Sequence, residues 1–188
     1  MRKPAVITFI MFFLFIDGQA FSQGFKAGVS LAYYSVNDSV FKDVYGTGSM
    51  MFGASLSADI VKKLELRAEI DYFSSKGEMT LSKEEVTYTL IPIVAGLRFR
   101  IFDAKRISPY IGVGLDFCSY KEKVPERFGG DISGSKTGLH GELGTYVNLS
   151  RKLQLDINLR YLKASIEPFN EKREIGGFRA GVGVGYRF

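Results

Sequence analysis

The sequence contains few of the residues from which disulfides, metal sites and catalytic centres are built. Its 188 residues include one cysteine and one histidine. Cys118 has no second cysteine with which to form an internal disulfide, and a single histidine far from a single cysteine is weak evidence for a metal site. The chain also contains no phosphate-binding Walker loop. We therefore predict no metal and no cofactor.

Other common patterns are missing from the chain beyond Gln23. We find no stretch of helical periodicity, no heptads, no low-complexity tract and no interdomain linker, and the length fits one domain. The formal net charge is +5, and the positive residues are spread along the chain. A small, dispersed excess of this kind is not the pattern of a nucleic acid-binding protein, so we expect no nucleic acid partner.

The N-terminus has the pattern of a secretory signal peptide, which we predict over residues 1–22. Residues 2 and 3 are basic, residues 5–16 form a short apolar run, and residues 20–22 place small side chains two apart before Gln23. A membrane anchor is the alternative, but a spanning helix needs roughly twenty apolar residues. We therefore expect an exported mature domain over residues 23–188.

The predicted mature domain is a series of strand-like segments in which apolar and polar residues alternate. The alternation is cleanest in residues 153–161, where Leu153 and Leu155 lie on one face and Gln154 and Asp156 on the other. We predict eight strands, over residues 24–35, 49–60, 64–75, 86–101, 107–120, 137–149, 153–164 and 175–188.

The connections between these segments alternate in length. The tight turns are 60–64, 102–106 and 149–153, and the longer polar links are 37–48, 76–83, 121–136 and 165–174. This predicts an all-β fold, an eight-stranded antiparallel up-and-down barrel of the kind that spans bacterial outer membranes. A soluble lipocalin-like barrel, with its apolar face inward, is the alternative. Pro92 lies inside the fourth segment, where we expect a bulge, because proline removes a ladder donor.

The polar faces favour a membrane barrel with a narrow polar interior. Glycines such as Gly181, Gly183 and Gly185 lie on them and would leave room for long neighbours in a lumen that only just holds side chains. The same faces carry balanced charges, and nearly all the bases are arginine, which suits confined pairing with carboxylates. The bases are Lys26, Arg67, Arg98, Arg100, Arg160, Arg179 and Arg187, and the acids are Asp59, Glu65, Glu69, Asp71, Asp116, Glu142 and Asp156.

Aromatic residues on the apolar face form two groups around an aliphatic band. The group near the long links contains Tyr33, Phe52, Tyr72, Phe117, Tyr161 and Phe178, and the group near the short turns contains Phe25, Phe99, Tyr186 and Phe188. Two aromatic girdles of this kind mark the two interfaces of a membrane. We therefore expect this face to contact outer-membrane lipid.

Four stretches carry a family resemblance: "QAFSQ" at the end of the predicted signal, "YTLIPIVAGLRFR", "SPYIGVGLDF" and the terminal "GVGVGYRF". They are similar to small OmpA/OmpX-like outer-membrane barrels, in particular to the outer membrane protein beta-barrel domain. The resemblance implies an integral outer-membrane protein whose terminal strand is read by the outer-membrane assembly machinery, with Tyr186 and Phe188 as the signal. It implies no cell-wall tether, since no peptidoglycan-binding domain follows, and we expect a monomer.

The resemblance leaves the function open, since members of the family include structural barrels, adhesion-related barrels and accessory parts of secretion machines. We expect a non-catalytic barrel with a plugged lumen and no steady conductance, because eight strands enclose little open cross-section. The long links are the favoured interaction surface toward an envelope or extracellular protein, with Phe41, Tyr45 and Phe128 as its aromatic anchors.

Two alternatives to this function are a small channel and a lipid A-modifying enzyme. An enzyme would use His140 as a base, beside Glu142 and the serines Ser133 and Ser135. The alternation along this strand places His140 on the face that points into the lumen, away from a lipid substrate. In a polar interior, a histidine beside an acid is usually part of a polar network.

Overall fold

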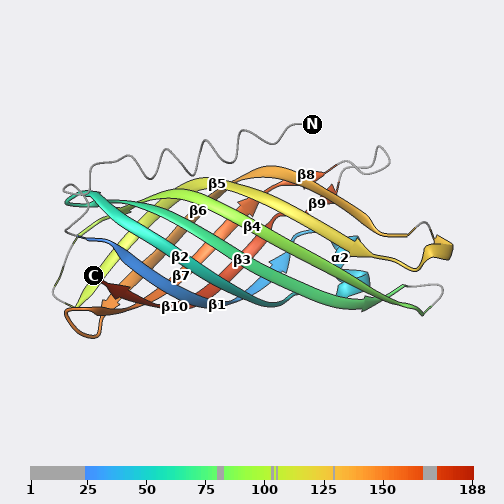
Figure 1. The fold of residues 1–188 in the computed structure, drawn as a ribbon, viewed down its shortest axis with the longest axis horizontal. Helices are drawn as coiled ribbons and strands as arrows, with labels where there is room; N and C mark the ends of the chain where they lie inside the picture. Colours follow the sequence, from blue (N-terminus) through green and yellow to red (C-terminus); the bar gives the residue numbers. More distant parts are fainter. Residues whose placement is uncertain (1–23, 80–82, 103, 105, 129, 167–172) are drawn as a thin grey trace.

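The computed structural model describes residues 24–79, 83–102, 104, 106–128, 130–166 and 173–188, with the backbone alone for Phe128, Ile166 and Arg173. The predicted signal peptide lies outside the described residues. Within them, eight antiparallel strands close into a barrel (Figure 1), in the order β1-β10-β7-β6-β5-β4-β3-β2. The strands are β1 (Lys26–Val36), β2 (Ser49–Val61), β3 (Leu64–Glu78), β4 (Glu85–Arg100), β5 (Ile107–Lys123), β6 (Ile132–Asn148), β7 (Leu153–Lys163) and β10 (Gly177–Arg187).

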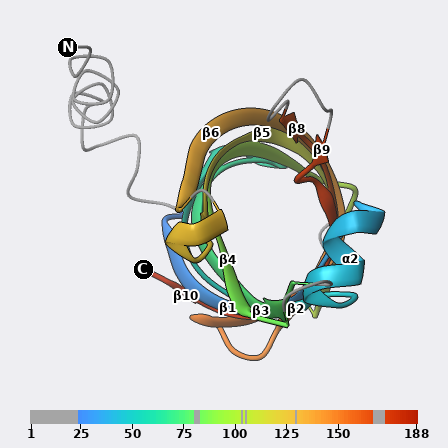
Figure 2. The same cartoon turned by 90° about the vertical axis from the view of Figure 1, so that its right-hand side faces the viewer.

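The first and last barrel strands pair along their whole length. The register runs from Lys26 opposite Arg187 to Val36 opposite Gly177, and this pairing closes the barrel. Seen along its axis, the barrel is a ring of strands (Figure 2). Closure satisfies every strand edge at membrane depth, where unpaired backbone groups are prohibitive. The predicted barrel is therefore confirmed.

The apolar face points outward, as a membrane barrel requires. Val29, Leu139 and Phe188 are each about two-thirds exposed, whereas Glu65 and Arg98 are fully buried inside. This arrangement excludes the lipocalin-like alternative, in which the apolar face would line the interior. The predicted aromatic residues of the long-link girdle, from Tyr33 to Phe178, all lie on the outer face.

A short helix, α2 (Ser39–Tyr45), occupies the first long link, where we expected no helix. The side chain of Asp38 caps it by accepting a hydrogen bond from the backbone N–H of Phe41 at 2.9 Å. Seven residues make two turns, which is too short for a helical period to be recognised in the sequence. No helix in the described part of the chain is long and apolar enough to cross a membrane.

The wall of the barrel is taller over β3 to β6 than elsewhere. Strands β5 and β6 pair as far as Glu122 opposite Ile132, although we expected a link over residues 121–136. Where a strand extends past the membrane, both of its faces meet water. The residues of this extension therefore lack the alternation of apolar and polar types by which the rest of each strand was predicted. The short elements η1 (Glu126–Phe128), β8 (Ser165–Ile166) and β9 (Arg173–Glu174) lie at the same end (Figure 1).

Pro92 does not cause the bulge that we expected. The register between β3 and β4 is the same on both sides of it, from Ile70 opposite Ile93 to Phe73 opposite Leu90. Proline interrupts the ladder there without inserting an extra residue. The register shifts instead between Asp59 and Val61, at the end of β2.

Candidate functional site

The interior of the barrel has two layers. Charged side chains fill the half nearest the short turns, and an apolar cluster fills the half nearest the long links. This order follows from the register, since β1 begins at the buried Lys26 and ends at the buried Val36. We call these layers the charge network and the apolar cluster.

Arg98 lies at the centre of the charge network and is fully buried. Its Nε and Nη2 donate to the two carboxylate oxygens of Glu142 at 2.6 and 2.9 Å, and its Nη1 donates to Asp156 Oδ2 at 2.9 Å. A planar guanidinium is well suited to this bidentate pairing. The arrangement also explains why arginine predominates among the interior bases.

Glu69 gathers three arginines from three different strands. It accepts hydrogen bonds from Arg67 Nε at 3.1 Å, from Arg160 Nη2 at 2.7 Å and from Arg179 Nη2 at 2.8 Å. Arg160 and Arg179 also lie within 3.5 Å of Asp71. A buried charge costs several kcal/mol unless it is paired in this way, so these contacts hold the strands together across the lumen.

Tyrosines and a lysine extend the network toward the short turns. Tyr110 donates to Asp156 Oδ1 at 2.6 Å, and Tyr146 donates to Glu65 Oε1 at 2.7 Å. Lys26 donates to the other oxygen of Glu65. At the mouth, Arg100 pairs with Asp59 at 2.9 Å and donates to the backbone carbonyl of Lys62 at 2.6 Å.

The predicted network residues all lie inside the barrel, and one of them differs from the others in its partner. The residues are Glu65, Arg67, Glu69, Arg98, Arg100, Asp116, Glu142, Asp156, Arg160 and Arg179. Among the described residues, every acid of this set except Glu65 and Asp116 pairs with an arginine; Glu65 pairs with Lys26, and Asp116 alone bonds a histidine, at His140 Nδ1. The sequence did not indicate this pair, because the two residues lie on adjacent strands, 24 positions apart.

His140 does not meet the serines that a catalytic site would need. It is buried in the lumen beside Asp116, whereas Ser133 and Ser135 are exposed near the far end of β6. Glu142, the neighbouring acid, is engaged by Arg98. No cluster of metal-ligating side chains occurs among the described residues.

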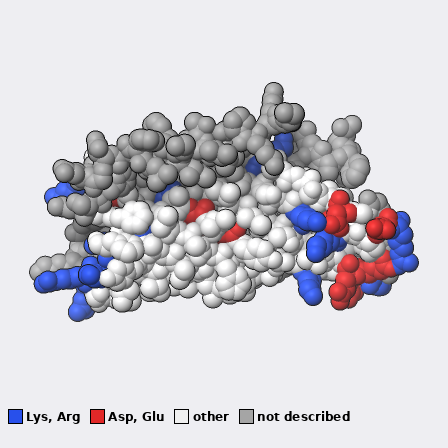
Figure 3. Space-filling view, viewed as in Figure 1, with Lys and Arg blue, Asp and Glu red and all other residues white. Residues whose placement is uncertain are grey.

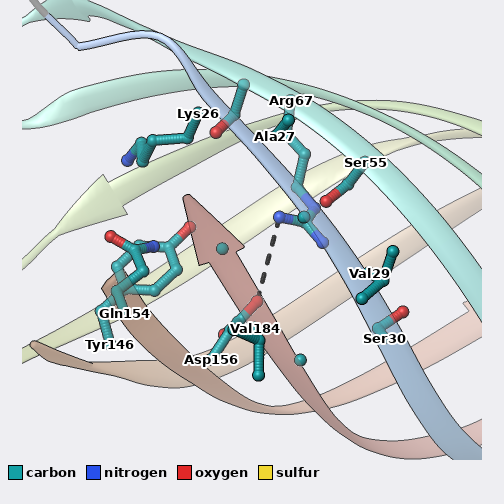
Figure 4. Close-up of a pocket in the computed structure, with 14 residues that line it drawn as sticks. Lys26, Ala27, Val29, Ser30, Ser55, Arg67, Tyr146, Gln154, Asp156 and Val184 are labelled. Carbon is teal, nitrogen blue, oxygen red and sulfur yellow. Dashed lines mark ion pairs between the residues drawn. The ribbon is translucent and has the colours of Figure 1, made fainter. Parts of the chain in front are cut away.

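A small cavity remains within the charge network (Figure 4). It has a volume of about 20 Å³ and is lined by Lys26, Arg67, Tyr146, Gln154 and Asp156 among others. Arg67 Nη1 and Asp156 Oδ2 face each other across it at 3.9 Å. A space of this size holds about one water molecule and is too small for a solute.

The apolar cluster was not predicted from the sequence. Its members lie on the inward face at the long-link end and are almost fully buried; they include Tyr34, Val36, Met51, Phe73, Tyr88, Leu90, Cys118 and Leu162. The sequence does contain a sign of this cluster. At Tyr72 with Phe73 and at Phe117 with Cys118, two apolar residues are adjacent, whereas strict alternation would place a polar residue at the second position. Such pairs show that both faces of the wall are apolar there.

Helix α2 covers this cluster. The Phe41 ring stacks on Tyr45 with centroids 4.7 Å apart and meets Tyr88 edge-on at 5.1 Å. The Tyr45 hydroxyl donates to Glu122 of β5 at 2.5 Å, and Ser75 of β3 donates to the Tyr45 carbonyl at 3.2 Å. Burial, together with the hydrogen bond to Glu122, raises the pKa of Tyr45 well above its usual value.

The helix does not present the aromatic anchors that we expected on the long links. Tyr45 is buried and Phe41 is half-buried, and both rings point into the apolar cluster. These rings are buried rather than available to a partner because an aromatic ring in a link is stabilised by packing on an apolar surface close to it. The Phe128 side chain lies outside what the structure describes.

The two residues of the predicted assembly signal lie on the outer face at the short-turn end. Tyr186 and Phe188 are exposed, and their ring centroids are 5.2 Å apart. Phe188 donates its backbone N–H to the carbonyl of Phe25, the residue directly before β1, at 3.0 Å. Recognition of these residues by assembly machinery stays a prediction.

Comparison with known proteins identifies a family. The model of the family described as "Outer membrane protein beta-barrel domain" matches residues 10–188. No curated protein matches the chain. Among solved structures, Neisserial surface protein A is 21% identical with a TM-score of 0.63, over 88% of this chain and 97% of that one.

Two further solved structures share the fold at low identity. OprG from Pseudomonas aeruginosa is 16% identical with a TM-score of 0.65, over 92% of this chain and 99% of that one. Ail, the attachment invasion locus protein of Yersinia pestis, is 19% identical with a TM-score of 0.58, over 88% and 99%. At such identities the likeness concerns the fold alone.

Proposed function

The chain belongs to the outer membrane protein beta-barrel family and resides in the bacterial outer membrane, and from this premise we propose that it is a non-catalytic, plugged barrel that presents its long-link end to a protein partner. It acts as a monomeric scaffold. The barrel holds the tall wall of β3 to β6 rigidly above the membrane, as interaction surfaces are commonly held by rigid frameworks.

The observation that carries this proposal is the filling of the lumen by two layers in series. In the charge network, Glu69 is engaged by three arginines, and the small cavity beside Arg67 and Asp156 holds about one water molecule. Beyond it, the apolar cluster and α2 cover the long-link end. A solute would have to displace both layers, so transport receives less support than a scaffold role.

The same geometry gives little support to an enzyme. His140 is enclosed in the lumen with Asp116, while lipid contacts the outer face of the barrel. A lipid substrate on that face would be separated from the imidazole by the wall. We therefore assign His140 to the charge network, and unchanged lipid A in a His140→Ala strain is the expected result.

The long-link end offers a mixed surface of charges to a partner. Lys121 pairs with Asp131 at 2.8 Å, and both side chains are about half exposed. Figure 3 shows acidic and basic side chains side by side at this end of the molecule. The extended ends of β5 and β6 are therefore the part of the surface that we expect a protein to contact.

The proposal is tested by purifying the tagged protein from its native outer membrane in mild detergent and identifying what accompanies it. We expect a stoichiometric protein partner, and we expect a variant in which residues 124–131 are replaced by a short glycine-serine turn to lose it. A matched control shortens the link over residues 165–174. Arrival of the barrel alone, or equal recovery from both variants, would overturn the interaction role.

A further inference from the structure

The short-turn end of the barrel carries pairs of basic residues. Each tight turn of the sequence contains one such pair: Lys62 with Lys63, Lys105 with Arg106, and Arg151 with Lys152. Lys105 lies outside the described residues, and the other five side chains are exposed. We propose that these five described side chains bind the phosphate groups of anionic phospholipids in the periplasmic leaflet of the outer membrane.

The charges of the short turns lie directly beside the lipid-facing band. The turn between β2 and β3 consists of Lys62 and Lys63 alone, directly after Val61, which is 60% exposed on the outer face. Leu149 and Leu153 frame the turn of Arg151 and Lys152 in the same way. A turn this short keeps its cations within one side-chain length of the hydrocarbon, at the depth of lipid headgroups.

Positive charge predominates at this end, since the three short turns contain six basic residues and one acid. The one acid, Asp103, lies outside the described residues. Asp59, at the edge of the lumen, is engaged by Lys26 and Arg100. Figure 3 shows blue groups at the short-turn end, on the left, and a mixture of red and blue at the other end.

Contacts with the barrel hold some of these cations at the interface. Lys152 Nζ lies 5.6 Å from the centre of the Tyr186 ring, in the aromatic girdle of the short-turn end. Lys63 Nζ donates to the Ile101 carbonyl at 3.1 Å. Both contacts keep an ammonium group beside the lipid-facing surface and leave it able to donate further hydrogen bonds.

These features favour lipid over an acidic protein or the cell wall. A protein or wall polymer would need a surface that projects into the periplasm, whereas the turn of Lys62 and Lys63 has two residues and the turn of Arg151 and Lys152 has four, so both project little. A basic residue near an anionic lipid surface gains about fivefold in binding. The basic turns thus form a collar that prefers anionic lipids on the side of the membrane opposite the long links.

The experiment measures lipid selectivity directly. The mature protein is reconstituted in phosphatidylcholine vesicles that contain trace spin-labelled phosphatidylglycerol or spin-labelled phosphatidylcholine, and the motionally restricted fraction of each label is compared. We expect a preference of about two- to fivefold for phosphatidylglycerol. Added salt at about 1 M should remove most of it, because the charges are exposed.

Two matched variants locate the effect. One changes Lys62, Lys63, Arg151 and Lys152 to glutamine, and the control changes the exposed Lys42, Lys76, Lys83 and Lys136 of the other end to glutamine. We expect the first variant to lose the preference and the control, with the same net charge, to keep it.

Folding of both variants is checked by the difference in gel migration between unheated and boiled samples. Three outcomes would overturn the proposal: no preference in the wild-type protein, a preference that survives in the short-turn variant, or equal loss in both variants. The last would mean that net charge, rather than the basic turns, attracts the lipid.

Discussion

Arg98 and Glu142 form a bidentate ion pair across the strand that separates them. The two residues lie on β4 and β6, and each is opposite Gly112 of β5 in the sheet register. The guanidinium and carboxylate meet at 2.6 and 2.9 Å above the position where Gly112 lacks a side chain. The ion pair and the glycine therefore depend on each other.

Removing the charge of Glu142 should destabilise the barrel. In Glu142→Gln, the buried guanidinium of Arg98 keeps Asp156 but loses its bidentate partner, so we expect the free energy of unfolding to fall by about 3 kcal/mol. Urea titration in detergent micelles measures the loss. Asp131→Asn, which removes a carboxylate from an exposed pair with Lys121, is the control and should change nothing measurable. Equal stability of the two variants would contradict an energetic role for the charge network.

A side chain at Gly112 should be poorly tolerated. A Cβ there would lie 2.7 Å from Glu142 Oε1 and 3.0 Å from the Leu97 carbonyl oxygen, and the backbone cannot move away easily. We expect Gly112→Ala to cost about 1–3 kcal/mol in the same titration. Gly141 lies on the outer face with open space around its Cβ position, so Gly141→Ala is a matched control that should be neutral. A neutral Gly112→Ala would show that the pair can shift without cost.

The barrel itself could be predicted because apolar and polar residues alternate along most of the length of its strands. In β7, buried and exposed residues alternate from Leu153 to Lys163, and the sequence shows the same alternation of apolar and polar types. The alternation fails where lipid no longer covers the outer face. The extension of β5 to Lys123 and the helix over Ser39–Tyr45 lie in that region, where no periodicity distinguishes a strand from a link.

The site could be predicted in composition but not in pairing. The alternation of the strands placed Arg98, Glu69 and Glu142 inside the barrel. It did not indicate which acid each arginine would contact. Arg98 and Glu142 are 44 positions apart, and their contact depends on strand register and barrel closure. The apolar cluster was missed for a different reason, since alternation was assumed to continue inside the barrel at every height.

Cys118 should report whether α2 seals the long-link end. Its side chain is fully buried in the apolar cluster, which Phe41 and Tyr45 cover. We expect a maleimide to label the folded wild-type protein very slowly and to label a Phe41→Ala, Tyr45→Ala variant at least tenfold faster, as judged by mass spectrometry. The control is Val40→Ala on the exposed side of the helix. Rapid labelling of the wild type would mean that the cluster is open to solutes from the long-link side.

The two layers of the lumen should block ion flow independently. The charge network and the apolar cluster lie one above the other along the lumen, so ions can pass only if both layers are open. We therefore expect no stable conductance step in a planar bilayer from the wild-type protein, from Arg98→Ala with Glu142→Ala, or from Phe41→Ala with Tyr45→Ala.

Combining all four substitutions should produce small, stable steps, provided that the gel shift on boiling shows the variant to be folded. The reason is that each pair of substitutions removes large side chains from only one layer, while the other layer remains filled. Steps in the Arg98→Ala, Glu142→Ala variant alone would show that the apolar cluster does not seal the lumen. Steady conductance in the wild-type protein would contradict the plugged barrel and favour a channel.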